Sequence, residues 1–395
     1  MAALSPVLAP ICDGRRLPRI ATATVVRALV VMFLARLGSL NALEQTQGQP
    51  AWRRWLGQPL PSADSLGRIA ALLDLTTLRQ ALGVLYRRLR QSKALQATSH
   101  GLTALVLDAH ECHATYRRCC AGCLERRVRT KNGYRTQYYH RVVVAMLCTR
   151  PFPLLLDVEP LIEADGEIQA ACRLLERVLR DYPRAFDVLL GDALYSDAAV
   201  YRLLTAHGKD VLTVLKRNTP ELFEDAQLIF AHTPPTQTLP LQGGDRLVWD
   251  AEGFQSWPTL GHSVRVVRSS EATTVRRQLD GHKETLLTEW MWITTLSVHR
   301  AGTEAVVRLG HTRWDIENLG FNEGAHRWHM DHVYRHHPTA LLACMLLAMI
   351  AYNLFHAFYY RNLHPALRRR RSYLHVARCI AAELYPYGSP PARPP

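Results

Sequence analysis

The sequence predicts an α/β protein: a mixed β-sheet with flanking helices, preceded by a helical segment and interrupted by a β-rich insertion. Three observations predict this class. Leucines recur at three- and four-residue steps near the N-terminus, apolar runs alternate with helical stretches in the middle, and a section punctuated by Pro and Gly follows. At 395 residues the chain is long enough for two or three domains with a hydrophobic core.

Residues 1–98 are predicted to form a basic helical domain. Ser62–Ser65 offer helix-capping side chains ahead of a leucine stripe that indicates an amphipathic helix. The stripe consists of Leu72, Leu75, Leu78, Leu82, Leu85 and Leu89. Two interpretations remain open: a helical bundle with a solvated basic face, and a module that reads DNA bases.

Residues 99–218 are predicted to form the first part of an α/β core. The apolar runs read as strands are 102–107, 139–146, 153–157, 187–191 and 210–216. A helix with Asp165 as its candidate cap lies between the third and fourth runs, and a second helix around 197–206 precedes the last run. Three early strands followed by strand–helix alternation predict a mixed sheet covered by helices.

Residues 219–298 are predicted to form a β-rich insertion of short strands. The candidate strands are Arg246–Trp249, Val264–Val267 and Trp290–Thr295. Trp249 and Trp257 lie here, and each is either a core side chain or a residue that stacks on a DNA base.

Residues 299–360 return to helical spacing and form the predicted second part of the core. Ala340–Tyr360 carries no formal charge and is long enough to span a bilayer. Asn353 and His356 interrupt this stretch, which favours a helix buried between layers of the protein. Residues 361–395 are predicted to be a basic, partly disordered tail that is mobile after residue 380.

The net charge of +14 is concentrated on the two flanks of the chain. Residues 1–98 hold 13 Lys and Arg against 4 Asp and Glu, and residues 361–395 hold 7 against 1. This arrangement indicates flanks that bind a polyanion such as DNA. The first twenty residues contain arginines and no apolar core, so we expect no secretory signal, and reduced thiols for the nine cysteines.

Three acidic residues far apart in the chain are the candidate site. Asp108 follows the apolar run 102–107, Asp192 follows Val188–Gly191, and Glu317 lies in a stretch with helical spacing. Taken singly, each is also explained as an ordinary surface acid. Clustered carboxylates repel one another unless a cation neutralises them, and Mg²⁺ prefers oxygen ligands. Together they predict a two-metal site that acts on phosphodiesters.

Three sequence blocks carry a resemblance to a known family. Leu105–Asp108, Gly191–Asp197 and Arg313–Glu317 resemble the three motifs of DDE transposases from bacterial insertion sequences, in particular the branch with a β-strand insertion between the second Asp and the Glu. The resemblance spans roughly residues 60–360. It implies a ribonuclease H-like catalytic domain, with Asp108, Asp192 and Glu317 as catalytic ligands of two Mg²⁺ ions, for which Mn²⁺ can substitute.

The resemblance also implies an activity and partners. The expected activity is metal-dependent cleavage and strand transfer at the ends of an insertion sequence. The partners would be double-stranded DNA, both transposon ends and target, and a second copy of the chain in a homodimer on DNA. We expect no membrane association and a cytoplasmic, nucleoid-associated location. The alternatives are a ribonuclease H-like nuclease without strand transfer and a catalytically degenerate DNA-binding protein.

The degenerate alternative arises from two departures from the branch's Tyr-x-x-Arg-x-x-x-Glu-x6-Lys signature. Arg313 matches its Arg, but Gly310 occupies the Tyr position and Gly324 the Lys position. In the family those two residues contact DNA near the cut. Arg327 is the nearest base to the missing Lys. Lys216 and Arg217, after the fifth predicted strand, are candidate replacements for phosphate contact.

A cysteine-rich loop is expected after the first predicted strand. Cys112, His113, Cys119, Cys120, Cys123 and His140 are donors of the kind that bind zinc, and Cys119, Cys120, Cys123 and His113 are the preferred set for a structural zinc ion. The alternative is a loop with unligated thiols. Basic residues surround the cysteines, and Arg126 and Arg127 among them are expected to contact DNA phosphates.

Overall fold

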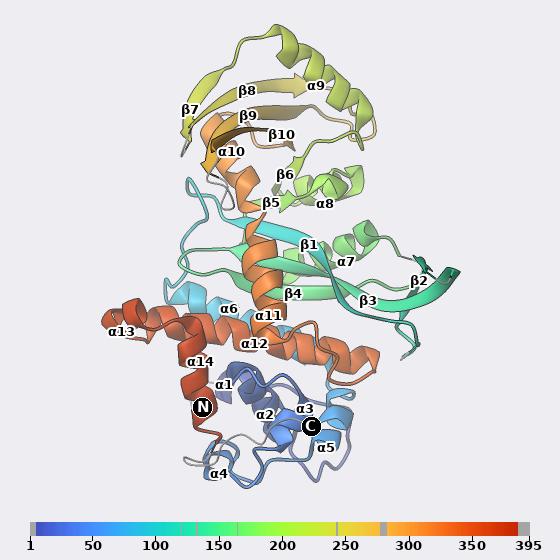
Figure 1. The fold of residues 1–395 in the computed structure, drawn as a ribbon, viewed down its shortest axis with the longest axis vertical. Coiled ribbons are helices and arrows are strands. Elements are labelled where there is room, and N and C mark those ends of the chain that lie inside the picture. The colour runs from blue at the N-terminus through green and yellow to red at the C-terminus, as the bar shows by residue number, and fades with distance from the viewer. Residues whose placement is uncertain are drawn as a thin grey trace.

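The computed structural model describes residues 5–118, 120–131, 133–163, 165–241, 244–276 and 283–385. N-terminal helices lie at one end, a central sheet follows, and a β-rich region forms the other end (Figure 1). The described strands are β1 (Ala104–Thr115), β2 (Leu124–Thr130), β3 (Gly133–Cys148), β4 (Leu154–Pro160), β5 (Val188–Gly191), β6 (Asp210–Val214), β7 (Gln237–Leu241), β8 (Gly244–Phe254), β9 (Val264–Arg276) and β10 (Lys283–Thr294).

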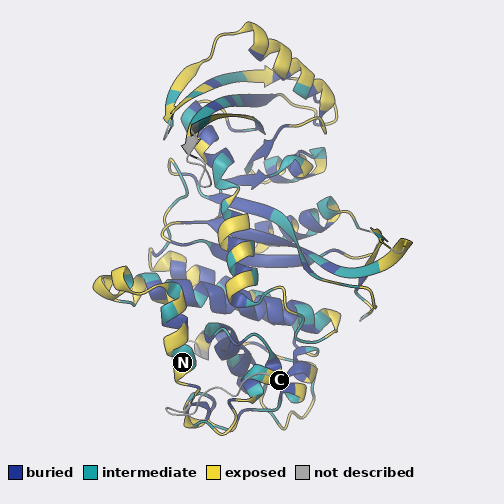
Figure 2. Cartoon of the chain, viewed as in Figure 1, coloured by how far each residue is buried: buried dark blue, intermediate teal, exposed yellow. Residues whose placement is uncertain are grey.

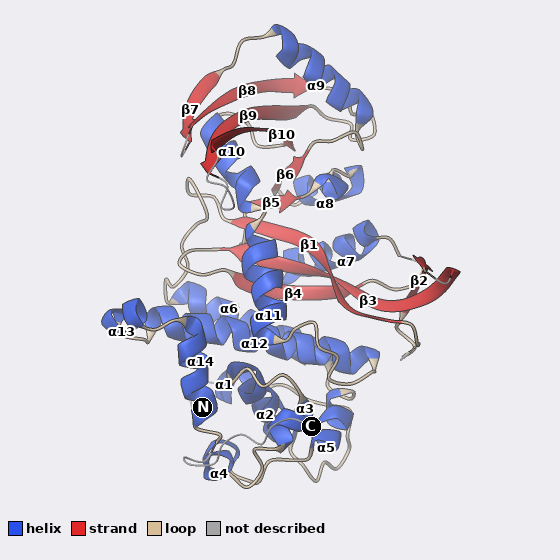
Figure 3. Ribbon diagram, viewed as in Figure 1, coloured by secondary structure: helices blue, strands red, loops and turns tan. Residues whose placement is uncertain are grey.

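The helices surround this sheet, as Figure 3 shows. They are α1 (Ser5–Leu8), α2 (Thr22–Leu34), α3 (Leu40–Glu44), α4 (Pro50–Leu56), α5 (Ala63–Ala70), α6 (Leu75–Gln91), α7 (Glu167–Asp181), the 3-10 helix η2 (Ala193–Tyr195), α8 (Ala198–Ala206), α9 (Pro220–His232), α10 (Thr303–Thr312), the π-helix η3 (Ile316–Asn322), α11 (Glu323–Trp328), α12 (Pro338–Arg361), α13 (Pro365–Arg370) and α14 (Tyr373–Ala382).

The described strands form one mixed sheet in the order β2-β3-β1-β5-β6-β10-β9-β8-β7, with β4 paired to β3. β1, β5 and β6 are parallel neighbours, whereas β1 with β3 and β3 with β4 are antiparallel. The five strands β4-β3-β1-β5-β6 and their flanking helices form a ribonuclease H-like core. The predicted α/β class with a mixed sheet is therefore confirmed.

Two features of the first strands differ from the prediction. Asp108 was expected at the end of a strand, but β1 continues seven residues beyond it to Thr115. The region after β1 was expected to be a loop, but it contains β2, which forms a hairpin with β3. β2 escaped detection because most of its side chains are polar and exposed, so no alternation of apolar and polar residues marks it.

The β-rich region is part of the core sheet. β10 pairs with β6 through Trp292↔Val214 and its neighbours, and β9, β8 and β7 follow outward. The prediction of short strands was wrong for β8, β9 and β10, which span 11, 13 and 12 residues. Since their outer halves carry polar residues, only the apolar inner segments stood out in the sequence.

The N-terminal helices bury most of the predicted leucine stripe. Leu78, Leu82, Leu85 and Leu89 of α6 are buried, whereas Leu72 is 49% exposed. Leu72 lies between two helices, because the predicted capping segment begins α5 and not the leucine-rich helix. The Ser62 side chain accepts a hydrogen bond from the Ser65 amide at the start of α5, and α6 has its own cap. Asp74 provides that cap by accepting from the Thr76 amide.

The long apolar helix α12 lies in the core, as expected. In the most apolar 18-residue stretch of this helix, 72% of the residues are buried inside the protein. The helix packs between β4 and the N-terminal helices (Figure 2). Asn353 explains one polar interruption: its side chain donates to the Leu155 carbonyl and accepts from the Leu155 amide, at 2.8 and 3.0 Å. His356 lies 3.4 Å from the Glu323 carboxylate. Both polar side chains therefore serve packing within the protein.

Two smaller predictions also need correction. Asp165 does not cap α7, whose N-cap is Gly166; instead the Asp165 carboxylate pairs with Arg173 at 2.6 Å. The chain was predicted to be mobile after residue 380, but α14 continues to Ala382 and Leu384 is fully buried. The remaining part of the predicted tail, 386–395, lies outside the described residues.

Candidate active site

Asp108 and Asp192 lie side by side at the centre of the sheet. β1 and β5 are parallel, and their register includes Leu105↔Leu189 and Val106↔Leu190. The same register two residues further on reaches Asp108 and Asp192. Successive side chains of a strand point to opposite faces, so residues in the same register of neighbouring strands share a face. The edge where β5 ends therefore presents both carboxylates together.

Glu317 reaches the same place from the π-helix η3, which runs across β1 in Figure 1. The helix packs on the sheet at Gly320, where a Cβ would lie 3.4 Å from the Met146 sulfur of β3. The neighbour of Gly320 from another element is therefore a side chain of the sheet. A π-helical turn inside a helical segment is frequent at functional sites.

Arg313 joins the acidic residues. Its Nη1 atom lies 3.6 Å from Oδ2 of Asp108 and 3.2 Å from Oε1 of Glu317, so these two carboxylate oxygens are closer than the sum of both distances. The Arg313 side chain is largely buried, as is that of Asp108. A cation thus lies between the first and third of the predicted catalytic residues.

The electrostatics of Asp108 reflect this crowded position. Burial, together with the negative charges of Asp192 and Glu167, raises the pKa of its carboxyl from 3.8 to about 6. The Ala109 amide, which donates to Asp108, and the Arg313 guanidinium act in the opposite direction. Negative charge is therefore costly at Asp108 unless more positive charge is supplied.

Glu167 is a fourth carboxylate at this site, which the sequence analysis missed. It is the first residue of α7, accepts a hydrogen bond from the Tyr195 hydroxyl at 2.9 Å, and pairs with Arg141 at 2.8 Å. Burial, and then the charge of Asp192, raises the pKa of Glu167. Its position in the first turn of a helix gave no hint of proximity to the strand-end acids, because that proximity depends on how α7 packs.

The other acids near Asp192 have structural roles. Asp187 accepts a hydrogen bond from the Thr103 amide, and Asp197 caps α8 by accepting from the Ala199 amide. Asp192 itself caps the short helix η2 through the Leu194 amide. Of these three acids, Asp192 is the one that lies beside Asp108 when the β1–β5 register is continued by two residues.

A comparison with known families decides the assignment. The family model of the transposase DDE domain matches residues 100–354, well over half of the chain. The chain belongs to the DDE transposase family. No curated protein matches the sequence. The matched range contains Asp108, Asp192 and Glu317. The three sequence blocks therefore lie within one matched transposase domain.

The structure of this DDE transposase gives a steric reason for Gly310, one of the two glycines in its signature region. A Cβ at Gly310 would overlap the Trp292 indole of β10, and a Cβ at Gly324 would lie 3.1 Å from the Met330 sulfur. At Gly310 the space next to the backbone is already filled by an aromatic side chain. The missing Tyr is therefore linked to the presence of Trp292, whose side chain is fully buried.

The basic residues expected to contact DNA occupy different surroundings. Lys216 and Arg217 are exposed directly after β6, and Arg327 is exposed at the end of α11. Arg127 lies over the Tyr134 ring on the β2–β3 hairpin, with 5.3 Å between guanidinium and ring centre. Arg126 is engaged within the protein by two hydrogen bonds to Glu111, at 2.6 and 2.8 Å.

The aromatic residues near the site are not the ones selected from the sequence. Trp257 is a core residue, buried against Tyr201, and Trp249 donates its indole hydrogen to the Thr233 carbonyl. Trp290 and Trp314 instead contact each other edge to face beside the acidic site, with 5.4 Å between ring centres. Trp314 is 43% exposed. Trp290 also lines a groove with Lys216 and Arg268.

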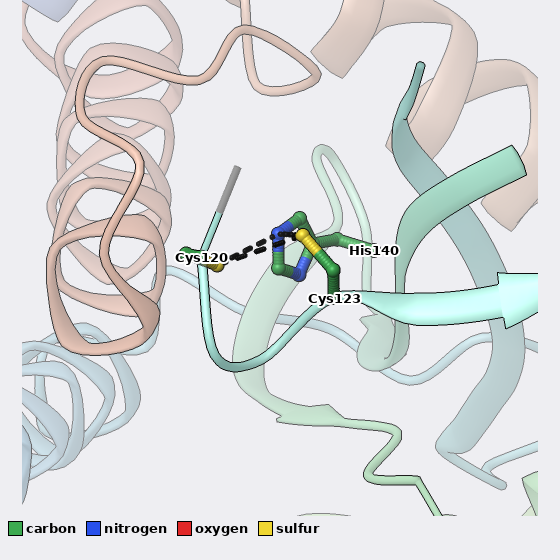
Figure 4. A group of neighbouring side chains, drawn as sticks. All are labelled: Cys120, Cys123 and His140. Carbon is green, nitrogen blue, oxygen red and sulfur yellow. Dashed lines mark hydrogen bonds between the residues drawn. The ribbon is translucent and has the colours of Figure 1, made fainter. Parts of the chain in front are cut away.

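The candidate zinc donors are partly brought together. Cys120 and Cys123 meet His140, and the three donor atoms lie within 4.8 Å of one another (Figure 4). Of the preferred set, Cys119 lies outside the described residues. His113 lies beside this group, paired in register with His140 across β1 and β3.

Proposed function

We propose that this DDE transposase cleaves DNA at the ends of an insertion sequence and joins the freed ends to target DNA by metal-dependent phosphoryl transfer. Asp108, Asp192 and Glu317 are the proposed catalytic residues and metal ligands. The proposal is carried by the parallel register of β1 and β5, which brings Asp108 beside Asp192 when it is continued by two residues, and by the contacts of Arg313 with both Asp108 and Glu317.

The donor set fits Mg²⁺ on two grounds. Carboxylate oxygens are the ligands that Mg²⁺ prefers, and Arg313 already places positive charge between Asp108 and Glu317. When bound, two Mg²⁺ ions, or Mn²⁺ in their place, supply activation of the attacking oxygen and charge stabilisation of the leaving oxygen. Arg313 would then be released from the carboxylates and able to bind a DNA phosphate.

The surrounding residues would position DNA over this site. Lys216, Arg217, Arg327 and Arg127 are exposed cations suited to phosphate contact, whereas Arg126 would first have to leave Glu111. We propose double-stranded DNA, both transposon ends and target, as the substrate. Because two ends are joined in one event, we propose a homodimer on DNA, acting in the cytoplasm at the nucleoid.

The test uses the full chain and DNA carrying the inverted repeats that flank its gene. We expect Mg²⁺-dependent cleavage at the repeat boundary, and strand transfer when precleaved ends are supplied. Asp192→Asn should abolish both reactions, whereas Asp225→Asn, at an exposed position on α9, should preserve them. Gel-shift assays should show that both variants still bind the ends, so that loss of chemistry is separated from loss of binding.

Two results would replace the proposal. Cleavage without joining of precleaved ends would indicate a ribonuclease H-like nuclease. Specific DNA binding with no cleavage, unchanged by Asp192→Asn, would indicate a catalytically degenerate DNA-binding protein. The absence of Tyr and Lys from the signature motivates this second outcome, although the packing of Trp292 on Gly310 supplies a structural reason for the first of those departures.

A further inference from the structure

A second cluster of metal-binding side chains lies apart from the acidic site, between β1, β2 and β3. Cys120 and Cys123 belong to the connection from β1 to β2, and His140 belongs to β3. Figure 4 shows their side chains pointing toward one another from these separate segments. The Cys123 and His140 side chains have little exposure, 3% and 8% for the residues. We propose that this cluster binds a structural zinc ion.

The distances between the donor atoms match those of a tetrahedral zinc site. With Zn–S near 2.3 Å and Zn–N near 2.05 Å, tetrahedral angles place two sulfurs about 3.8 Å apart and a sulfur and a nitrogen about 3.6 Å apart. Here the two Sγ atoms are 3.8 Å apart, and Nε2 of His140 lies 3.3 Å from Cys120 Sγ and 3.6 Å from Cys123 Sγ. A disulfide would need the sulfurs at about 2.05 Å.

His113 is the proposed fourth ligand. It faces His140 across the β1–β3 pairing, directly after a register shift between Glu111 and His113. Within the described part of the chain, its buried Nε2 atom has no hydrogen-bond partner. A buried polar atom without a partner is costly, and coordination would satisfy it. A rotation of the His113 side chain toward the group would complete a two-cysteine, two-histidine site, the chemistry that zinc prefers over magnesium.

The location indicates what the ion would do. The cysteine connection lies against the start of α12, since a Cβ at Gly122 would be 3.1 Å from a ring carbon of Pro338. From there the chain enters the β2–β3 hairpin, whose outer part exposes Arg127, Arg129 and Arg135. A zinc ion would tie the connection that enters β2 to His140 of β3 at the base of this basic hairpin. The arginines at the outer part of the hairpin would then be held in one orientation.

The direct test is the metal content of the full chain, purified without an oligohistidine tag and under reducing conditions. Mass spectrometry of the metal should give about one zinc per chain. Cys123→Ser and His140→Ala should each lower zinc content at least tenfold. Cys172→Ser is the matched control, because that half-buried thiol lies on α7 away from the cluster, and it should leave the zinc content unchanged.

Two further measurements do not depend on how well the variants fold. Cobalt added to the zinc-depleted wild-type chain should produce the visible absorption of tetrahedral cobalt with thiolate ligands. Removing zinc with a chelator should speed proteolysis within 124–135 more than elsewhere. Wild-type protein without zinc and without the cobalt spectrum would overturn the proposal. Retention of full zinc affinity by His113→Ala would overturn the assignment of the fourth ligand.

Discussion

Replacing Asp108 by Asn should make the protein inactive and more stable at neutral pH. Asn keeps the shape of the side chain and can still accept the hydrogen bond from the Ala109 amide, but it carries no charge. Burial and the neighbouring acids raise the pKa of Asp108 from 3.8 to about 6. The folded protein therefore holds this proton more tightly than the unfolded chain does.

The sign of the effect follows from this difference. Stability contributed by protonated Asp108 is present below pH 4 and is lost as pH rises through the folded pKa of about 6. A shift of one pKa unit corresponds to 1.36 kcal/mol, so ionised Asp108 costs the wild-type fold roughly 3 kcal/mol at pH 8. The free energy of unfolding of Asp108→Asn should exceed that of the wild type by well below 1 kcal/mol at pH 4 and by roughly 3 kcal/mol at pH 8.

The assay is denaturant unfolding of both proteins between pH 4 and pH 8 in the absence of divalent ions, with Asp225→Asn as a control that should show no such trend. Adding Mg²⁺ at pH 8 should stabilise the wild type and narrow the gap, because a ligand that binds only the folded state stabilises it by about 2.7 kcal/mol at one hundred times its Kd. A gap that does not change with pH would refute the claim that folding desolvates this carboxylate.

Three further changes test other parts of the structure. Gly310→Tyr should lower the free energy of unfolding by about 1–3 kcal/mol through overpacking against Trp292, and the same substitution should cost less in a Trp292→Ala background, as measured by denaturant unfolding of the four chains of this cycle. Asn353→Ala should cost about 1–3 kcal/mol for each Leu155 backbone group left without a partner, measured in the same way. Lys216→Ala should weaken DNA binding and reduce the slope of log affinity against log salt concentration by about one.

The core of the fold was predictable because its strands are apolar on both faces. The segments 104–107, 142–148 and 188–190 are unbroken runs of buried residues, and they lie in β1, β3 and β5. Strands with polar faces were missed or shortened: β2 and β7 were missed entirely, and β8 to β10 were predicted without their outer halves. Local patterns record burial, so an element that projects into solvent leaves little trace of its strand character.

The acidic site was predictable in part for a similar reason. Asp108 and Asp192 interrupt buried runs, and a charge next to a buried strand requires an explanation. Glu317 was found through its motif with Arg313, whereas Glu167 had no such local signal. Glu167 lies in an ordinary amphipathic helix and reaches its partners only through tertiary packing. Sequence alone therefore located the three predicted acids but not the fourth carboxylate, which α7 brings to them.

The departures from the family signature are informative when they are considered together with their neighbours. Trp292 packs against the Gly310 backbone, stacks on Trp290, and lies edge to face with His311. His311 in turn is 2.8 Å from Glu271 and directly precedes the segment that carries Arg313 and Glu317. A side chain at position 310 would overlap the Trp292 indole, so the glycine and the tryptophan fit together as a pair in a closely packed region.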